Sequence, residues 1–127
     1  MEKQFADYET SKKLKELEFD ESCFGVYSIN GKFSYAHKVL QTYRPKNSQV
    51  GIFPTAPLWQ QVEEWLFDKH KIRIDILSHG DVPDHDFICS VLLNESVLVQ
   101  SVFEHPIKAR MDGIRQSVEY LHKQLNK

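Results

Sequence analysis

Five residues that could hold a metal ion are gathered in one short stretch of the chain. They are two histidines and three aspartates within eight positions: His79, Asp81, Asp84, His85 and Asp86. Imidazole and carboxylate groups together are ligands for zinc, iron or manganese. No established signature, such as H-E-x-x-H or a calcium-binding loop, is present. Glycine and proline among these residues are typical of a polar loop between strands. We therefore expect a solvated loop and assign no metal, with a small metal-dependent enzyme as the alternative.

The serines and the two cysteines match no signature of a nucleophilic enzyme. The sequence contains no G-x-S-x-G turn, no G-x-G-x-x-G segment and no P-loop. Cys23 and Cys89 lie in separate apolar segments, without the close spacing of metal sites or the cysteine density of a disulfide framework. We predict that both are reduced and buried. We assign no catalytic residue and no cofactor, and expect the protein not to be an enzyme.

Nucleic-acid binding is a second alternative. Basic and aromatic residues alternate around one predicted hairpin and the loop after it: Lys32, Tyr35, His37, Lys38, Tyr43, Arg44 and Lys46. Such a surface can stack bases and follow a phosphate backbone. The net charge of −2, however, lacks the basic excess typical of proteins that bind phosphates. We expect the aromatic residues to fill a core instead.

Length and composition are those of a soluble globular protein. The 127 residues fit a single domain, 1–127, and the aromatic fraction of 12% argues against disorder. No segment is apolar enough to span a membrane, and the first residues do not resemble a signal peptide. We therefore expect no membrane association and a cytoplasmic location.

Three helices are predicted. The first runs from about Tyr8 to Glu18, capped by Asp7. The second starts with Thr55 as its N-cap and ends near His70. The third is the C-terminal helix, in which Gly113 is expected to let a neighbour approach closely. Its apolar residues recur at spacings of three and four: Ile107, Met111, Ile114, Val118, Leu121 and Leu125.

Strand patterns lie between these helices. Asn30-Gly31, flanked by aromatic and β-branched residues, predicts a hairpin with a two-residue type I′ turn. Ile72–Ile76 alternates as a half-buried strand with its isoleucines inward, and Phe87–Leu93 and Val97–Phe103 read as two further strands. The resulting order is α-β-β-α-β-β-β-α. It predicts an α+β fold with three helices and a mostly antiparallel sheet of about five strands.

Two features could form a protein interface. Trp59 is expected at the edge of the apolar stripe of its helix, next to Gln60 and Gln61, whereas Trp65 is expected in the core. A partly exposed tryptophan is a common anchor for a partner. The narrow apolar seam of the C-terminal helix could serve a homodimer, although packing on the sheet is the favoured reading.

Two stretches, Leu17–Tyr27 and Thr55–Leu66, together resemble a family of short uncharacterised bacterial and phage proteins. The family pattern reads LGFDEPCFG in the first stretch and APLWQQ at the start of a helix in the second. This chain has Glu18 and Ser22 where the pattern has glycine and proline. The resemblance implies a phage or mobile-element context and no established activity.

These observations favour a non-catalytic binding or accessory protein that acts through protein contacts, with a protein partner or a second copy of itself.

Overall fold

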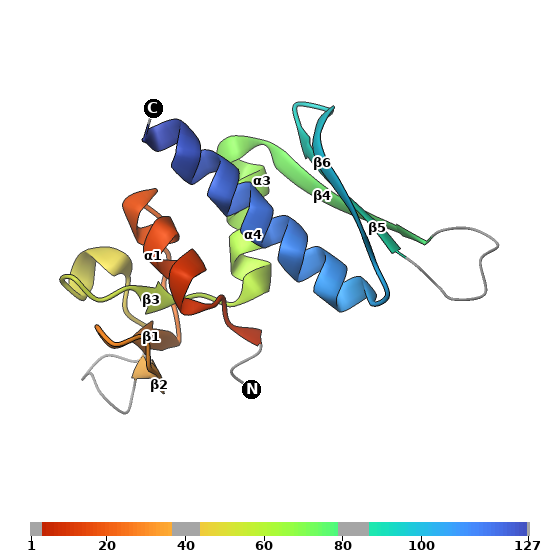
Figure 1. Ribbon diagram of the computed structural model, residues 1–127. Helices are drawn as coiled ribbons and strands as arrows, with labels where there is room; N and C mark the ends of the chain where they lie inside the picture. Colours follow the sequence, from red (N-terminus) through yellow and green to blue (C-terminus); the bar gives the residue numbers. More distant parts are fainter. Residues whose placement is uncertain (1–3, 37–43, 79–86, 127) are drawn as a thin grey trace. The chain divides into compact units, whose positions relative to one another are not determined.

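A computed structural model of the protein describes residues 4–36, 44–78 and 87–126. The chain divides into two compact units, one formed by residues 1–61 with 118–127 and the other by residues 62–117 (Figure 1). The predicted α+β class is confirmed. The strands, however, form two antiparallel sheets of three strands each, in place of the expected sheet of about five. Among the described residues, no helix combines the length and apolar content needed to cross a membrane.

Helix α1 (Tyr8–Glu16) begins as predicted, with Asp7 as its N-cap. The Asp7 carboxylate accepts a hydrogen bond of 2.8 Å from the Thr10 N–H, which satisfies one of the unpaired donors of the first turn.

The end of α1 is a Schellman motif with Glu18 at its left-handed position. The Phe19 N–H donates to the Leu14 carbonyl at 2.9 Å, and the Glu18 N–H donates to the Lys15 carbonyl at 3.1 Å. Glu18 has φ +66°, a conformation that glycine adopts without strain. The helix therefore ends two residues earlier than the sequence predicts.

The first sheet has the order β2-β1-β3, with β1 (Gly25–Tyr27) in the centre. Its neighbours are β2 (Phe33–Tyr35) and β3 (Thr55–Ala56), both antiparallel to it. Aromatic side chains dominate the core on this sheet. It consists of buried Phe5, Tyr27 and Ala56, with Tyr8, Phe33, Tyr35 and Leu58 packed against them.

The β1–β2 hairpin is confirmed, but its turn is not the predicted type I′. The Gly31 N–H donates to the Ser28 carbonyl at 2.9 Å, and the Ser28 N–H donates to the Lys32 carbonyl at 2.9 Å. Gly31 has φ +83°, whereas Asn30 does not have a positive φ. This is a three-residue loop with glycine at the bulge position, a common alternative for the same Asn-Gly sequence.

The prediction that Thr55 caps the second helix is wrong. It lies in β3, and its N–H donates to the side-chain oxygen of Asn47 at 2.9 Å. Asn47 begins the short 3₁₀ helix η2 (Asn47–Gln49) and also donates from its amide to the Phe19 carbonyl at 2.7 Å. Helix α3 (Trp59–His70) therefore starts later, once the chain has left the sheet.

The second sheet has the order β4-β5-β6: β4 (Ile72–Ser78), β5 (Phe87–Leu93) and β6 (Ser96–Phe103). A two-residue turn joins β5 to β6, since Leu93 pairs with Ser96. Asn94 and Glu95 both have positive φ, as a type I′ turn requires. The predicted strands are confirmed here to within a few residues.

Helix α4 (Pro106–Leu125) packs one face of this sheet through Gly113. A Cβ at Gly113 would lie 2.6 Å from the Cys89 sulfur and 2.9 Å from a methyl carbon of Ile74. The prediction that Gly113 allows close approach is confirmed. Ile114 and Val118, in the middle of the apolar seam, are buried, whereas Ile107 and Leu125 at its ends are exposed. The centre of the seam is therefore covered within the molecule, and the favoured reading, packing on the sheet, is supported at the neighbouring Gly113.

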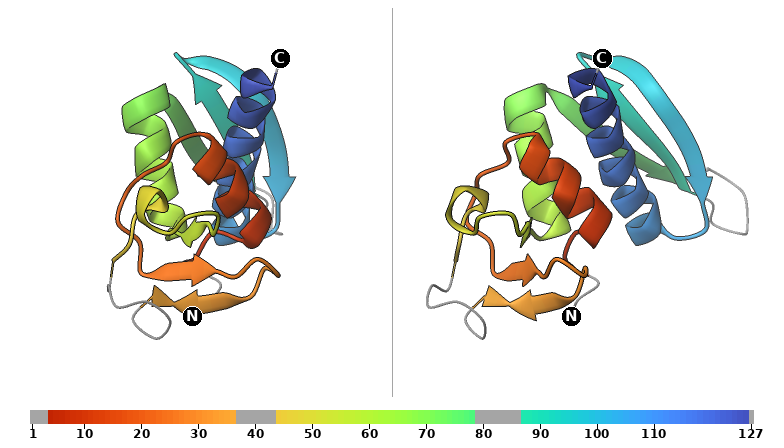
Figure 2. Two further views of the ribbon diagram at one scale, coloured as in Figure 1. Left: turned by 90° about the vertical axis from the view of Figure 1, so that its left-hand side faces the viewer. Right: turned by 60° about the vertical axis from the view of Figure 1, so that its left-hand side comes forward.

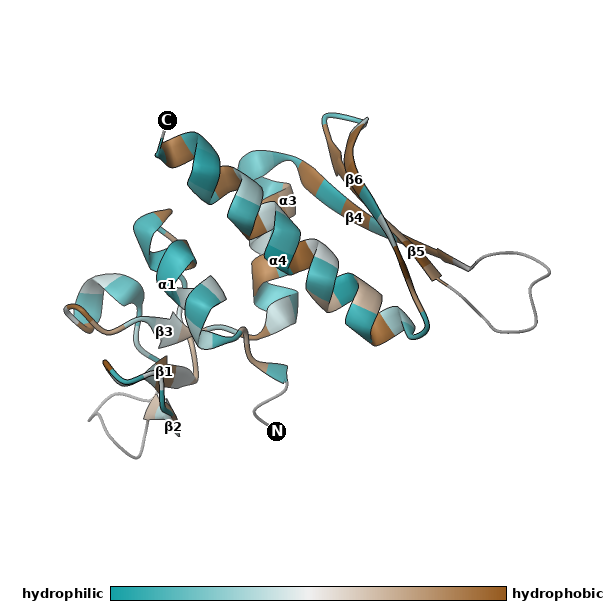
Figure 3. Ribbon diagram, in the orientation of Figure 1, coloured by the Kyte–Doolittle hydropathy of each residue, from teal (hydrophilic) through white to brown (hydrophobic). Residues whose placement is uncertain are grey.

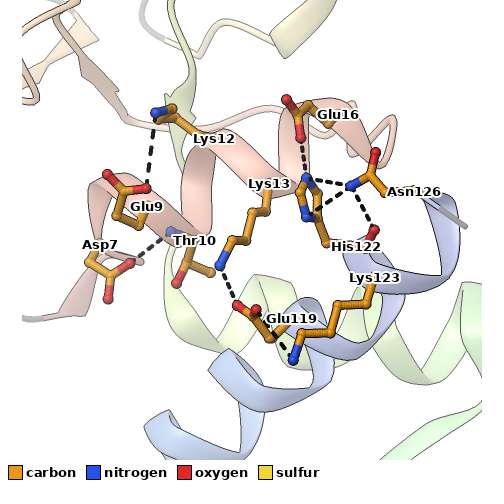
Figure 4. Close-up of polar contacts among 10 residues, drawn as sticks. All are labelled: Asp7, Glu9, Thr10, Lys12, Lys13, Glu16, Glu119, His122, Lys123 and Asn126. Carbon is orange, nitrogen blue, oxygen red and sulfur yellow. Dashed lines mark hydrogen bonds and ion pairs between the residues drawn. The ribbon is translucent and has the colours of Figure 1, made fainter.

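The last turns of α4 are tied to α1 by charged side chains (Figure 4). Lys13 pairs with Glu119, and Glu16 pairs with His122. The hydrogen bond from Lys13 holds the pKa of Glu119 below its usual value. These ion pairs are at least partly exposed, so they help to hold α4 against α1 and do not form a binding or catalytic site.

Candidate functional site

The expected interface around Trp59 does not have the predicted exposure. Trp59 is 7% exposed and Trp65 is 5% exposed, so both indoles are buried. Trp59, Val62 and Leu66 are all buried at the spacing i, i+3, i+7, and Trp59 therefore belongs to the buried stripe instead of lying at its edge. The prediction erred because it placed Leu58 inside the helix, whereas α3 begins at Trp59.

Gln61 is also occupied within the chain. Its side-chain oxygen accepts from the Leu58 N–H at 3.0 Å, and its amide donates to the Ser22 carbonyl at 2.8 Å. Gln61 thus caps the start of α3 and ties it to the segment before β1. Of the three residues proposed for this interface, Gln60 alone is exposed. A single exposed glutamine is no longer an argument for a binding site.

The metal candidates His79, Asp81, Asp84, His85 and Asp86 lie outside the described residues. Within the described ranges, no group of three or more His, Cys, Asp or Glu side chains is arranged to hold a metal ion.

The nucleic-acid candidates are partly described, and His37, Lys38 and Tyr43 lie outside the described ranges. Tyr35 is half-buried and packs edge-to-face on Phe33, with ring centroids 5.2 Å apart. The Arg44 guanidinium lies over the Phe24 ring at 4.7 Å. Tyr35 thus contributes to the aromatic core, as the sequence analysis expected.

The two cysteines are free and buried, as predicted. Burial raises the pKa of the Cys23 thiol to about 11 and also raises the pKa of the Cys89 thiol. A thiol with a raised pKa is protonated at neutral pH and is a poor nucleophile. Neither cysteine has the chemistry of a catalytic residue.

The two faces of the second sheet differ sharply. Ile74, Cys89 and Val91 lie beneath Gly113 of α4, and on a strand the residues between them point to the opposite side. We call that opposite side the outer face. It consists of Arg73, Asp75, Leu77, Ile88, Ser90, Leu92, Val97, Leu98, Gln100 and Val102. Figure 2 shows α4 along one side of this sheet.

Apolar side chains occupy both ends of the outer face. Leu77, Ile88 and Val102 are directly opposite one another across the three strands and form one apolar row. Leu77 is 60% exposed and Val102 is 62% exposed. Leu92 and Val97 form a second apolar pair towards the β5–β6 turn, with Val97 53% exposed. Figure 3 shows the hydrophobic segments along β4, β5 and β6 in brown.

Polar side chains separate the two apolar rows. The Gln100 amide donates to the Ser90 hydroxyl at 3.2 Å. Arg73 pairs with Asp75 at 3.1 Å and with Glu95 at 3.0 Å. These charges all lie at β4 or at the β5–β6 turn, so the β6 side of the outer face has none.

Among the described residues, strand β6 pairs with β5 alone and so forms an edge of this sheet, and it lacks the charged residues and prolines that often protect an edge. Its eight residues, Ser96–Phe103, include no charged residue and no proline, and none of them is buried. The other edge strand, β4, carries Arg73 and Asp75. A bulge interrupts β6, because Val97 pairs with Leu92 and Val99 with Val91, which leaves Leu98 as an extra residue. From Val99 onward the strand pairs with β5 without interruption to Phe103.

The apolar pattern of the sequence predicts this strand, but such a segment is typical of a core and indicates no other role. The absence of charge along Ser96–Phe103 is visible in the sequence. What the sequence does not reveal is that this strand lies at an edge.

Comparison of the chain with protein-family models, curated proteins and solved structures finds no match.

Proposed function

We propose that this protein is a non-catalytic binding module that acts through protein contacts, and that it binds through the outer face and the free edge of the β4–β5–β6 sheet. The observation that carries the proposal is β6. It is an eight-residue edge strand without a charged side chain, and its Val97 and Val102 are 53% and 62% exposed.

An exposed edge strand presents a row of backbone N–H and C=O groups that another chain can pair with. Proteins that must stay monomeric blunt such edges with lysine, proline or inward-pointing charges. β6 has none of these, and the apolar row Leu77, Ile88 and Val102 continues up to it. Backbone pairing at the edge and apolar contact on the outer face together suit recognition of a protein strand.

The resemblance to short phage and bacterial proteins supplies a proposed setting, that of an accessory protein of a phage or mobile element. It contributes nothing to the mechanism, which depends on the sheet.

The proposal is tested with the full chain and three lysine variants. Val102→Lys places a charge at the edge, and Leu77→Lys places one on the outer face away from β6. Ile52→Lys is the matched control, since Ile52 is 74% exposed and belongs to the other compact unit. Complexes of the wild-type chain are isolated from the cells that produce it. Each captured protein is then purified and mixed with the wild-type chain or with a variant, to see whether the complex forms again. Self-association of each chain is measured by light scattering.

We expect wild type and Ile52→Lys to form a reconstituted complex or an oligomer, and Val102→Lys to lose it. If the complex survives both Val102→Lys and Leu77→Lys, the surface is wrong. If wild type binds no purified protein, itself included, the proposed function is wrong.

A further inference from the structure

We infer that the partner at β6 is a second copy of this chain, paired through an antiparallel β6–β6 contact around a two-fold axis. The inference rests on the proposed function, because it names the partner of the same surface. Pairing of this kind would join two three-stranded sheets into one of six strands.

The side chains of β6 alternate regularly over the part beyond the bulge. Ser101 lies on the α4 side, because the Gln116 amide of α4 donates to its hydroxyl at 3.3 Å. Val99, two residues earlier, lies on the same side, and Leu98, Gln100 and Val102 therefore lie on the outer side. This segment offers an uncharged, ordered edge of alternating apolar and polar residues.

Antiparallel pairing selects one register from this pattern. Residues directly opposite each other must point to the same side of the sheet. A two-fold axis at Gln100 meets this requirement. It places Leu98 opposite Val102 of the second copy, so that apolar side chains meet on the outer face. An axis at Ser101 would instead set Gln100 against Val102, a polar residue against an apolar one.

The edge is self-complementary in charge as well. Two identical edges bring identical side chains together, so any lysine or glutamate near the axis would meet its own copy. β6 contains no such residue. A partner chain of different sequence could offset a charge at this edge with an opposite charge, whereas a second copy could not.

The assembly would also close at two copies. The remaining edge, β4, is protected by Arg73 and Asp75. A two-fold contact uses the same patch on both copies and leaves no free β6 edge for a third. At the other end of β6, the bulge disturbs the ladder before Val99, so the contact between Leu98 and Val102 is the last one that this register makes.

The first test is disulfide trapping of the register. In the proposed dimer the two Gln100 backbones are directly opposite, within the span that a disulfide bridges. Gln100→Cys should therefore form a covalent dimer in a glutathione buffer. Val102→Cys is the matched control on the same strand and face. Its two copies would be offset by four residues, about 14 Å along the strand, which is too far to bridge. Efficient trapping through Val102→Cys, or none through Gln100→Cys, overturns the inference.

The second test is charge exchange at the axis. Gln100→Lys and Gln100→Glu each oppose like charges, and we expect each to dimerise about five-fold more weakly than wild type. An equimolar mixture should form a heterodimer at least as stable as the wild-type dimer. Native mass spectrometry distinguishes the species, and circular dichroism checks that both variants fold. If the mixture of Gln100→Lys and Gln100→Glu associates as weakly as each variant alone, the two copies do not pair at Gln100.

Failure of this inference differs from failure of the proposed function. If wild type is monomeric but binds a different purified protein in a way that Val102→Lys abolishes, the surface stands and the second copy is excluded. If Leu77→Lys dissociates a wild-type dimer and Gln100→Lys does not, the contact is made by the outer face and the edge pairing is excluded.

Discussion

Replacing Glu18 by glycine should stabilise the protein. Glu18 has φ +66° at the left-handed position of the Schellman motif that ends α1. A residue with a Cβ pays roughly 1–2 kcal/mol to adopt this conformation. Glycine avoids that cost but gives up about 0.5–1 kcal/mol through its greater freedom in the unfolded chain. The Glu18 side chain is exposed, so its removal creates no cavity. Its negative charge at the C-terminal end of a helix is mildly unfavourable. We therefore expect a net gain of about 1 kcal/mol.

The measurement is urea unfolding followed by tryptophan fluorescence, since both Trp59 and Trp65 are buried in the folded protein. A gain of about 1 kcal/mol should raise the midpoint and leave the slope m unchanged. In thermal unfolding it should raise Tm by about 3–5 °C for a chain of this size.

Two further variants separate the backbone effect from the charge effect. Glu18→Ala removes the charge but keeps the Cβ, so it should gain at most a few tenths of a kcal/mol. Glu18→Asn should fall between alanine and glycine, because asparagine tolerates the left-handed region better than most residues. If the alanine variant is as stable as the glycine variant, the gain comes from the charge and the reasoning about the backbone is refuted.

Three other predictions concern close packing, a buried polar link and pH. Gly113→Ala should cost about 1–3 kcal/mol in urea unfolding, despite the better helix propensity of alanine, because its Cβ would meet the Cys89 sulfur at 2.6 Å. A stabilised variant would show that α4 is not held this closely. Asn47→Ala should cost about 2–4 kcal/mol, since it removes the buried hydrogen bonds that the Asn47 side chain makes with the Phe19 carbonyl and the Thr55 N–H; an unchanged urea midpoint would contradict this. Hydrogen bonds from the Ser48 N–H and hydroxyl lower the pKa of Asp20 in the folded protein. The ionised Asp20 carboxylate therefore stabilises the fold above its unfolded pKa of about 4, and this stabilisation is lost as the pH falls through the lower folded pKa. Asp20→Asn should therefore lose less stability than wild type between about pH 4 and pH 2, and parallel pH profiles would refute the assignment.

Local rules predicted most of the elements. Asp7 capped its helix, Ile72 and Ile74 faced inward, and Gly113 marked a close approach, because each depends on neighbours in sequence or on the absence of a side chain. Where one short sequence suits two local conformations, the sequence alone does not decide between them. Asn30-Gly31 favours a type I′ turn but also suits the three-residue turn that is present.

The errors at Thr55 and Trp59 have a common cause in long-range structure. Thr55 is a good N-cap by type, but pairing with β1 and the hydrogen bond to Asn47 hold it in a strand. Leu58 then lies before the helix, and the buried stripe of α3 runs through Val62 and Leu66, on the side that Trp59 shares. The proposed interaction surface was not predicted for a similar reason, because the position of a strand within its sheet depends on pairings that spacing does not encode.

The two compact units each contain one buried thiol, Cys23 in the first and Cys89 in the second. A thiol-labelling reagent can react with either only when its surroundings open, since Cys23 is 0% exposed and Cys89 is 2% exposed beneath α4. When reclosing is faster than labelling, the labelling rate reports the equilibrium population of the open form. One time course, resolved by peptide mass, would thus give a separate opening free energy for each unit. Equal values would indicate that the units open together, and unequal values that one can open while the other stays folded.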